Sequence, residues 1–152
     1  MIANNILALI LSFVLVFLII GLAELFKKLN LLGDEGSRKF IHIGVSNWWF
    51  LMMFLFDNVY IAIIAPIAFI VLNYVSYKTN LIKSMERSGN GNLGTVYFPI
   101  SLLLMVIFSF IVKNPFFGGL GILILGYGDG FAAVIGKKFG VKKLYKDKSY
   151  AG

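Results

Sequence analysis

Long apolar runs, separated by short polar segments, constrain this chain more than any other feature. Several runs reach about 18 residues or more with almost no charge, and a transmembrane helix needs about 20 such residues. We therefore predict an all-α polytopic membrane bundle that forms a single domain over residues 1–152. The five expected spans cover residues 2–26, 40–56, 59–77, 95–112 and 116–136, followed by a polar tail over residues 137–152. Pro66 is expected to kink the third span.

The composition excludes several classes of protein and of site. Hydrophobic residues make up 59% of the chain and charged residues 14%, whereas soluble domains contain about 45–50% and about 25%. The chain has no cysteine and one histidine. Disulfides, thiolate zinc sites, iron–sulfur clusters and sites with several histidines from one chain are therefore excluded. Any metal chemistry must use oxygen ligands.

The basic residues predict how the bundle sits in the membrane. The net charge is +7, and lysine and arginine number four in residues 27–39, none in 57–58, three in 78–94, one in 113–115 and six in 137–152. Because cytoplasmic loops carry the excess of basic residues, we expect the N-terminus outside and the tail in the cytoplasm. The charge is thus explained by membrane topology, and we do not expect nucleic-acid binding. The expected location is the cell membrane.

Three segments on the predicted cytoplasmic side carry polar residues that composition does not require. The first contains Arg38, Lys39 and His42, and the spacing of four places Arg38 and His42 on one helix face. Near a helix N-terminus such a face suits an anionic phosphate. The alternative is that the two basic residues only anchor the helix at the membrane surface.

The second segment, residues 89–99, is rich in glycine and includes Thr95, a plausible N-cap of the fourth span. A ligand-binding loop and a plain connection explain it equally well.

The third segment places Asp129 inside an apolar, glycine-rich run. An ionised carboxylate within a span costs about 2.5–3.5 kcal/mol and usually faces a cavity or a partner. We expect the glycines to leave room for a ligand. The alternatives are a structural pair between Asp129 and Arg38 or a helix end, and tail lysines that only bind anionic lipids.

Together these segments resemble the CTP-dependent lipid alcohol kinases, the family that contains dolichol kinase, phytol kinase and CTP-dependent diacylglycerol kinase. The resemblance covers roughly residues 37–152 and rests on three ordered motifs. These are Arg38-Lys39-x-x-His42, Gly94-Thr95-x-x-Phe98-Pro99, and Gly128-Asp129-Gly130-x-Ala132-Ala133-x-x-Gly136-Lys137-Lys138-Phe139-Gly140 with Lys148-Ser149-x-x-Gly152 after it.

The resemblance implies transfer of the CTP γ-phosphoryl group to the hydroxyl of a polyprenol or dolichol, phytol or diacylglycerol, with Mg²⁺ as cofactor. It implies that Asp129 binds Mg²⁺ or orients the hydroxyl, and that His42 accepts the alcohol proton or binds a phosphate oxygen. The lipid chain is expected between the fifth span and its neighbours. The implied nucleotide- and phosphate-binding residues are Arg38, Lys39, Gly128, Gly130, Lys137, Lys138, Lys148 and Ser149.

Two departures from the family pattern keep other interpretations open. Ala151 stands where the family commonly has glutamate, and family members usually continue with about two more membrane helices beyond the position of Gly152. The chain is expected to be a shortened member that assembles as a homo-oligomer, or a fragment or degenerate copy with reduced or no activity. The last motif also resembles phosphatidate cytidylyltransferases, which make CDP-diacylglycerol. A membrane scaffold is the non-enzymatic alternative.

Overall fold

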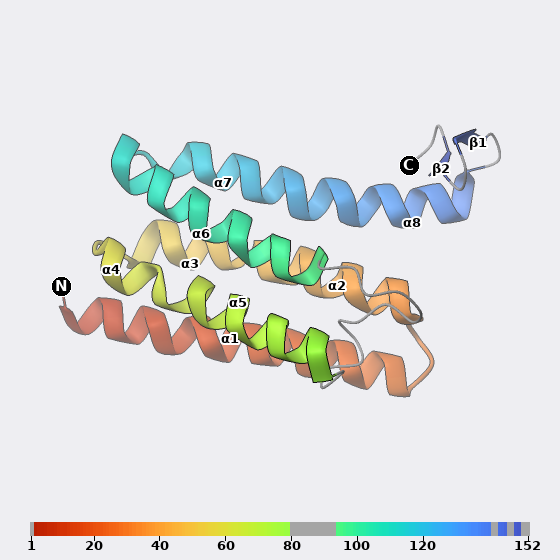
Figure 1. Cartoon of the computed structure of the whole chain (residues 1–152), viewed down its shortest axis with the longest axis horizontal. Helices are drawn as coiled ribbons and strands as arrows, with labels where there is room; N and C mark the ends of the chain where they lie inside the picture. The colour runs from red at the N-terminus through yellow and green to blue at the C-terminus, as the bar shows by residue number, and fades with distance from the viewer. Residues whose placement is uncertain (1, 80–93, 141–142, 146–147, 150–152) are drawn as a thin grey trace.

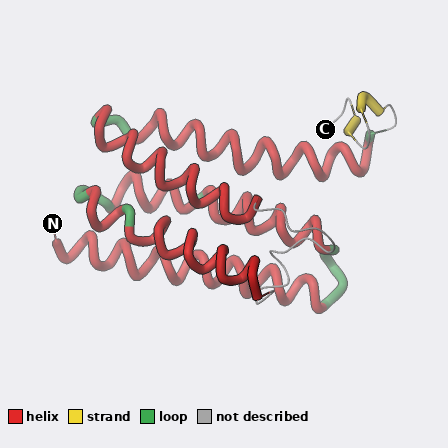
Figure 2. The backbone as a smooth tube through the Cα atoms, viewed as in Figure 1, coloured by secondary structure: helices red, strands yellow, loops and turns green. Residues whose placement is uncertain are grey.

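The computed structural model describes residues 2–79, 94–140, 143–145 and 148–149. For residues 2–3, 137–138 and those after 140 it describes the backbone only. The described chain is a bundle of antiparallel helices followed by a small hairpin (Figures 1 and 2). The elements are α1 (Ile2–Lys28), α2 (Asp34–Ser46), α3 (Trp48–Leu55), α4 (Val59–Ala62), α5 (Ile64–Thr79), α6 (Gly94–Val112), α7 (Pro115–Leu123), the π-helix η1 (Ile124–Gly128), α8 (Asp129–Phe139), β1 (Lys143–Tyr145) and β2 (Lys148–Ser149).

The helices run back and forth along the bundle, as the alternation of apolar and polar segments predicts. The N-terminus of α1 lies at one end, and α8 ends at the other (Figure 1). We call the latter the basic end, because α1 finishes there with Lys27 and Lys28, α2 carries Arg38 and Lys39 after its acidic first turn, and α5 finishes there with Lys78.

The all-α membrane bundle expected from the sequence is confirmed. Within the part of the chain that the structure describes, four helical segments are long and apolar enough to cross a membrane: Asn4–Lys28, Val59–Thr79, Gly94–Val112 and Pro115–Gly136. The remaining expected span, the second at residues 40–56, is built from α2 and α3, which follow one another along the bundle with a break at Asn47 (Figure 1). The last helix also continues to Phe139, three residues into the expected tail.

Local sequence signals explain where helices begin and break. The side chains of Asn58 and Asn114 cap α4 and α7 by accepting hydrogen bonds from the backbone of Tyr60 and Phe116, at 2.9 and 3.0 Å. The kink expected at Pro66 appears as the break between α4 and α5 at Ile63, in the turn before the proline, where its ring crowds the preceding carbonyl groups.

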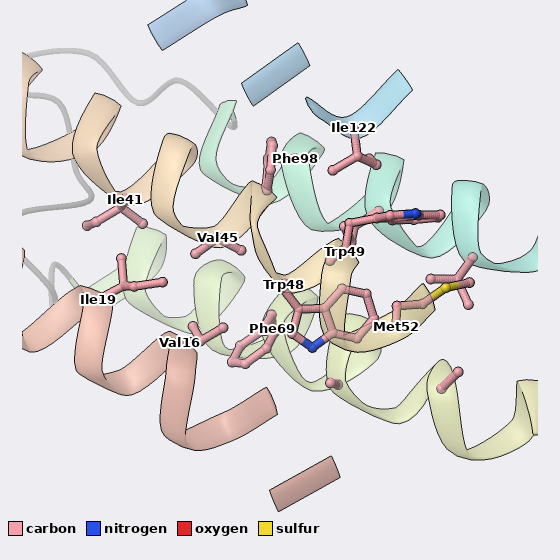
Figure 3. Packing of buried hydrophobic residues seen from close by; sticks show 14 of the residues in the cluster. Val16, Ile19, Ile41, Val45, Trp48, Trp49, Met52, Phe69, Phe98 and Ile122 are labelled. Carbon is pink, nitrogen blue, oxygen red and sulfur yellow. The ribbon is translucent and has the colours of Figure 1, made fainter. Parts of the chain in front are cut away.

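Two tryptophans at the start of α3 hold the centre of the bundle together (Figure 3). Trp48 and Trp49 are each 1% exposed. The indole of Trp49 lies against Gly118 and Gly119, where an added Cβ would fall 2.6 Å and 2.5 Å from the ring. Its Nε1 donates a hydrogen bond to the carbonyl of Pro115 at 3.0 Å. Glycines in α7 therefore allow the last helix to approach α3 closely.

The outer surface of the bundle is apolar, which suits a lipid environment. Residues such as Ile6, Ile10 and Phe17 on α1 are each more than half exposed. Without lipid around it, this much exposed apolar surface would be exceptional for a monomer.

Candidate functional site

A cleft of about 300 Å³ opens at the basic end, between α2, the first turns of α6 and the junction of η1 with α8. Its polar lining comes from three places that are far apart in the sequence. The lining residues whose side chains can contact a polar ligand are Arg38, Lys39, His42, Thr95 and Asp129, whereas the hydroxyl of Ser101, also in the lining, donates to the Tyr97 carbonyl of its own helix.

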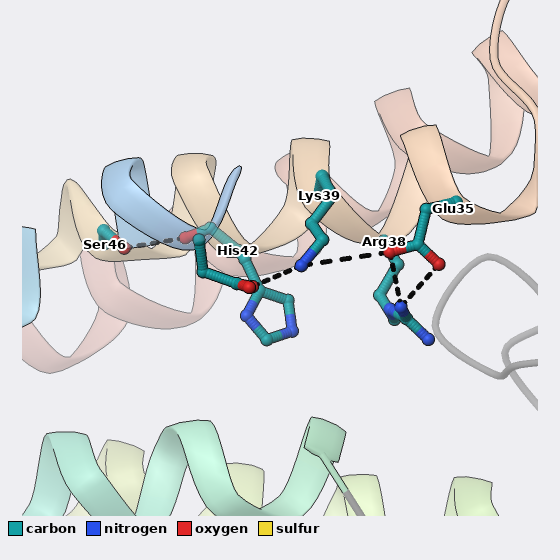
Figure 4. Close-up of polar contacts among 6 residues, drawn as sticks. Glu35, Arg38, Lys39, His42 and Ser46 are labelled. Carbon is teal, nitrogen blue, oxygen red and sulfur yellow. Dashed lines mark hydrogen bonds and ion pairs between the residues drawn. The ribbon is translucent and has the colours of Figure 1, made fainter. Parts of the chain in front are cut away.

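The second helix supplies the cationic side of the cleft. Arg38 and His42 extend from α2 in the same direction, as their spacing of four residues predicts, and Lys39 lies between them (Figure 4). One guanidinium nitrogen of Arg38, Nη2, donates to both carboxylate oxygens of Glu35 at 2.7 and 2.6 Å. The His42 ring packs against Phe98 with 4.8 Å between ring centroids. These contacts fix both side chains at the edge of the cleft.

Lys39 joins the two carboxylates of the site. Its ammonium pairs with Oδ2 of Asp129 and lies 3.9 Å from Oε1 of Glu35. The Lys39 side chain is only 10% exposed, whereas that of Asp129 is 52% exposed. The structure thus brings Asp129 to the cationic face of α2, although its partner is Lys39 instead of Arg38. Asp129 lies inside the apolar segment Pro115–Gly136, and its half-exposed carboxylate faces the cleft, as expected for an acid within a span.

Close packing between α2 and the last helix positions Asp129. A Cβ on Gly126 would fall 1.6 Å from Ser46 Oγ, and one on Gly130 would fall 2.5 Å from Ile43 Cδ1. These contacts lie on either side of Asp129 in the sequence. The expectation that the glycines leave room for a ligand is therefore wrong at Gly126 and Gly130, since α2 fills that space.

The π-helix directly before Asp129 is held to α2 and α3 by one long-range hydrogen bond. Tyr127 donates from its hydroxyl to Oδ1 of Asn47 at 2.9 Å, at the point where α2 meets α3. Single π-helical turns are uncommon overall, but they occur often at functional sites. In this chain the π-helical turn directly precedes Asp129, whose carboxylate lines the cleft.

Thr95, a buried residue of α6, also lines the cleft. The Asn73 side chain donates a hydrogen bond to its carbonyl at 2.8 Å. Thr95 is the second residue of α6, and its hydroxyl pairs with none of the described residues, so it does not cap the helix as the sequence suggested.

Four of the residues singled out in the sequence therefore meet at one cleft: Arg38, Lys39, His42 and Asp129. Gly128 faces open space, since nothing lies within 4 Å of an added Cβ. The side chains of Lys137 and Lys138, on the last turns of α8, lie outside the described part of the chain, as do those of Lys148 and Ser149 in β2.

Sequence reasoning missed two contributors. Glu35 precedes Arg38 by three residues and Lys39 by four, which is the spacing of helical ion pairs and could have identified it. No local signal connects Tyr127 with Asn47, because the two lie 80 residues apart.

The cleft offers oxygen ligands suited to a hard cation. The described contacts of Asp129 all go to Oδ2, and more than half of its side chain is exposed. Mg²⁺ commonly binds to one or two protein carboxylates together with waters and substrate phosphates, so Asp129 fits such a role. Among the described residues no group of three histidine, cysteine or acidic side chains could hold a metal without such help.

Comparison with known proteins identifies one similar protein of known activity. The chain is 31% identical over 118 residues to a phytol kinase from Synechocystis sp., an alignment that covers 78% of this chain and 51% of the relative. The chain thus spans about half the length of the curated relative that it matches. No family model matches it, and no solved structure does either. Together with the helical membrane fold, this similarity supports the resemblance to the lipid alcohol kinases that the three sequence motifs indicate.

Proposed function

We propose that this protein is a CTP-dependent kinase that phosphorylates the hydroxyl of a membrane isoprenoid alcohol at the cytoplasmic face of the cell membrane. The observation that carries the proposal is the cleft in which Arg38, Lys39, His42 and Asp129 meet, at the end of the bundle where the basic residues gather. The phytol kinase relative supports an alcohol of the phytol class. The choice of CTP rests on the family resemblance of the motifs.

Neutralising phosphate charge is the main task of such a site. Phosphoryl transfer needs positioning and electrostatic stabilisation more than covalent help from the protein. Arg38 and Lys39 bring two positive charges to the cleft, and only part of the donor capacity of Arg38 is used by Glu35. We assign to them the β- and γ-phosphates, with Arg38 better suited to planar two-point contacts than a lysine.

The reaction forms one bond and breaks one. The alcohol oxygen bonds to the γ-phosphorus as the bond from that phosphorus to the β–γ bridging oxygen breaks, and CDP leaves with the electron pair. The proton of the alcohol passes to His42, whose ring is held at the cleft by Phe98. Asp129 would hold Mg²⁺, which when bound supplies positive charge to the transferring phosphoryl group.

An acceptor and donor panel tests the proposal. Purified protein in nanodiscs is incubated with Mg²⁺, CTP or ATP, and phytol, geranylgeraniol, dolichol or diacylglycerol, and products are separated by chromatography. We expect a phosphorylated isoprenoid alcohol and CDP, with slower turnover from ATP. In a parallel reaction with phosphatidate in place of the alcohol, release of pyrophosphate with a CDP-lipid product would instead identify a cytidylyltransferase. If no nucleotide is consumed and CTP with Mg²⁺ does not raise the melting temperature, the scaffold interpretation holds.

A further inference from the structure

The polar cleft adjoins a second cavity of different character. This second cavity is a smaller pocket of about 30 Å³ between α1, α2, α5 and α6. Apolar side chains such as Val45, Phe69 and Leu102 line most of this pocket. The residues common to the two cavities are Arg38, His42, Thr95 and Phe98. A ligand that spans the junction would need a polar group at one end and a small apolar part at the other.

The hydroxyl of Thr95 lies at this junction without a partner. Thr95 is 5% exposed, and its Oγ1 forms no hydrogen bond with any described residue. Three other buried side-chain atoms of the described residues share that condition, on Ser37, Trp48 and Ser109, but none of them lines the cleft. A buried, unpaired hydroxyl is unfavourable, so it is a natural place for a ligand to supply the missing bond.

The backbone carbonyl of Thr95 accepts a hydrogen bond, whereas its side-chain hydroxyl forms none with the described residues. Asn73, 8% exposed and also at the apolar pocket, donates to the Thr95 carbonyl at 2.8 Å. The conformation of Thr95 is thus set before any ligand arrives. A neutral hydroxyl beside a phenyl ring is suited to another neutral hydroxyl, whereas the phosphates are drawn to Arg38 and Lys39 on α2.

We propose that Thr95 anchors the lipid acceptor by a hydrogen bond to its hydroxyl, at the junction of the cleft with the apolar pocket. This inference rests on the proposed function. The apolar pocket of about 30 Å³ is too small for the lipid chain, so the chain extends from the hydroxyl through the cleft. Tyr97 and Leu125, 57% and 42% exposed, line that cleft on α6 and η1. The lipid therefore lies between α2, α6 and η1, a position between the fifth expected span and its neighbours.

Binding of phytol without nucleotide tests the inference separately from catalysis. The probes are radiolabelled phytol and phytane, which has the same carbon skeleton without the hydroxyl, measured in detergent or nanodiscs with wild-type protein and with Thr95→Val, Thr95→Ser and Ser101→Ala. We expect Thr95→Val to weaken phytol binding about 3- to 10-fold and to leave phytane binding unchanged. Thr95→Ser keeps the hydroxyl and should bind phytol as the wild type does.

Ser101→Ala is the matched control, because Ser101 also lines the cleft but donates its hydroxyl to the Tyr97 carbonyl of its own helix at 3.1 Å. We expect it to bind phytol normally. Thr95→Val should melt at or above the wild-type temperature, since it removes an unpaired polar atom, whereas a structural hydroxyl would lower it.

The outcomes separate the two proposals. Equal phytol binding by the wild type and Thr95→Val overturns the anchoring role even if CTP-dependent phosphorylation is found. A wild type that does not prefer phytol over phytane overturns it as well. If Thr95→Val weakens phytol binding but no phosphorylation from CTP is detected, the binding site stands and the proposed kinase activity fails.

Discussion

Two carboxylates at opposite ends of the bundle, Asp57 and Asp129, form long-range contacts of very different kinds. Asp57 exchanges hydrogen bonds with Asn5: its backbone N–H donates to Asn5 Oδ1 at 3.1 Å, and the Asn5 amide donates to its carboxylate. Asn5 is 2% exposed. Asp129 instead pairs with the ammonium of Lys39, and that pair lines an open cleft.

The comparison shows how an acid that only stabilises the fold differs from one that is placed to contact a ligand. At the Asp57 end, a neutral amide satisfies the backbone and the carboxylate together, which fastens α1 to the turn after α3. At the basic end, carboxylate and cations face a common space and lie within reach of a ligand. The cations of the cleft can leave their carboxylate partners and bind phosphate oxygens, because the cleft is open to a ligand. The hydrogen bonds between Asn5 and Asp57 involve no cation that could bind a phosphate.

The largest effect should come from removing the charge of Asp129, and the same change at Asp57 is the control. Asp129→Asn is expected to lower the rate of phosphoryl transfer by about 100-fold or more, because it removes the proposed Mg²⁺ ligand. Asp57→Asn retains an acceptor oxygen for Asn5 and should leave that rate unchanged. Initial rates with labelled CTP and phytol measure both. Equal rates for Asp129→Asn and the wild type would remove Asp129 from the chemistry.

The next effect concerns the packing that places Asp129. Gly126→Ala should lower the free energy of unfolding by about 1–3 kcal/mol, because the new methyl group collides with Ser46. Gly128→Ala meets open space and should not destabilise the fold. Melting temperatures in detergent measure both. Combining Gly126→Ala with Ser46→Gly should recover part of the loss, and strict additivity of the two changes would contradict direct contact.

A smaller loss is expected at the structural end. Asn5→Leu removes the hydrogen bonds to Asp57 and should lower the free energy of unfolding by about 1–2 kcal/mol. The rate per folded molecule should stay at the wild-type value. Thermal unfolding followed by an activity assay below the transition tests this. A lost rate with an intact fold would show that this end also contributes to the chemistry.

The smallest effect sharpens the role of the cationic face. Arg38→Lys keeps the charge but loses the planar guanidinium, and should raise the KM for CTP about 5- to 10-fold. Arg87→Lys is the chemically matched control, outside the three motifs and outside the described residues, and should leave the KM unchanged. Steady-state kinetics at saturating phytol distinguish the two. An equal rise in both would indicate a general effect of basic charge at the membrane surface.

The helical membrane architecture was predictable because it follows from one-dimensional patterns. Apolar length predicted the spans, the spacing of Arg38 and His42 predicted their shared side of α2, and Pro66 predicted the break before α5. The break at Asn47 and the π-helical turn before Asp129 were not predictable, because packing against neighbouring helices selects them.

By itself, the sequence determined that this protein is an apolar helical bundle with basic connections and an isolated acid near its last helix, since these depend on composition and spacing along one chain. Only the tertiary structure decided that Asp129 pairs with Lys39, 90 residues away, that α2 fills the space of Gly126 and Gly130, and that an unpaired Thr95 hydroxyl lies between the polar cleft and an apolar pocket. The physical reason is that partner choice depends on which helix faces touch, and helices of similar apolar character leave that choice to side-chain shape.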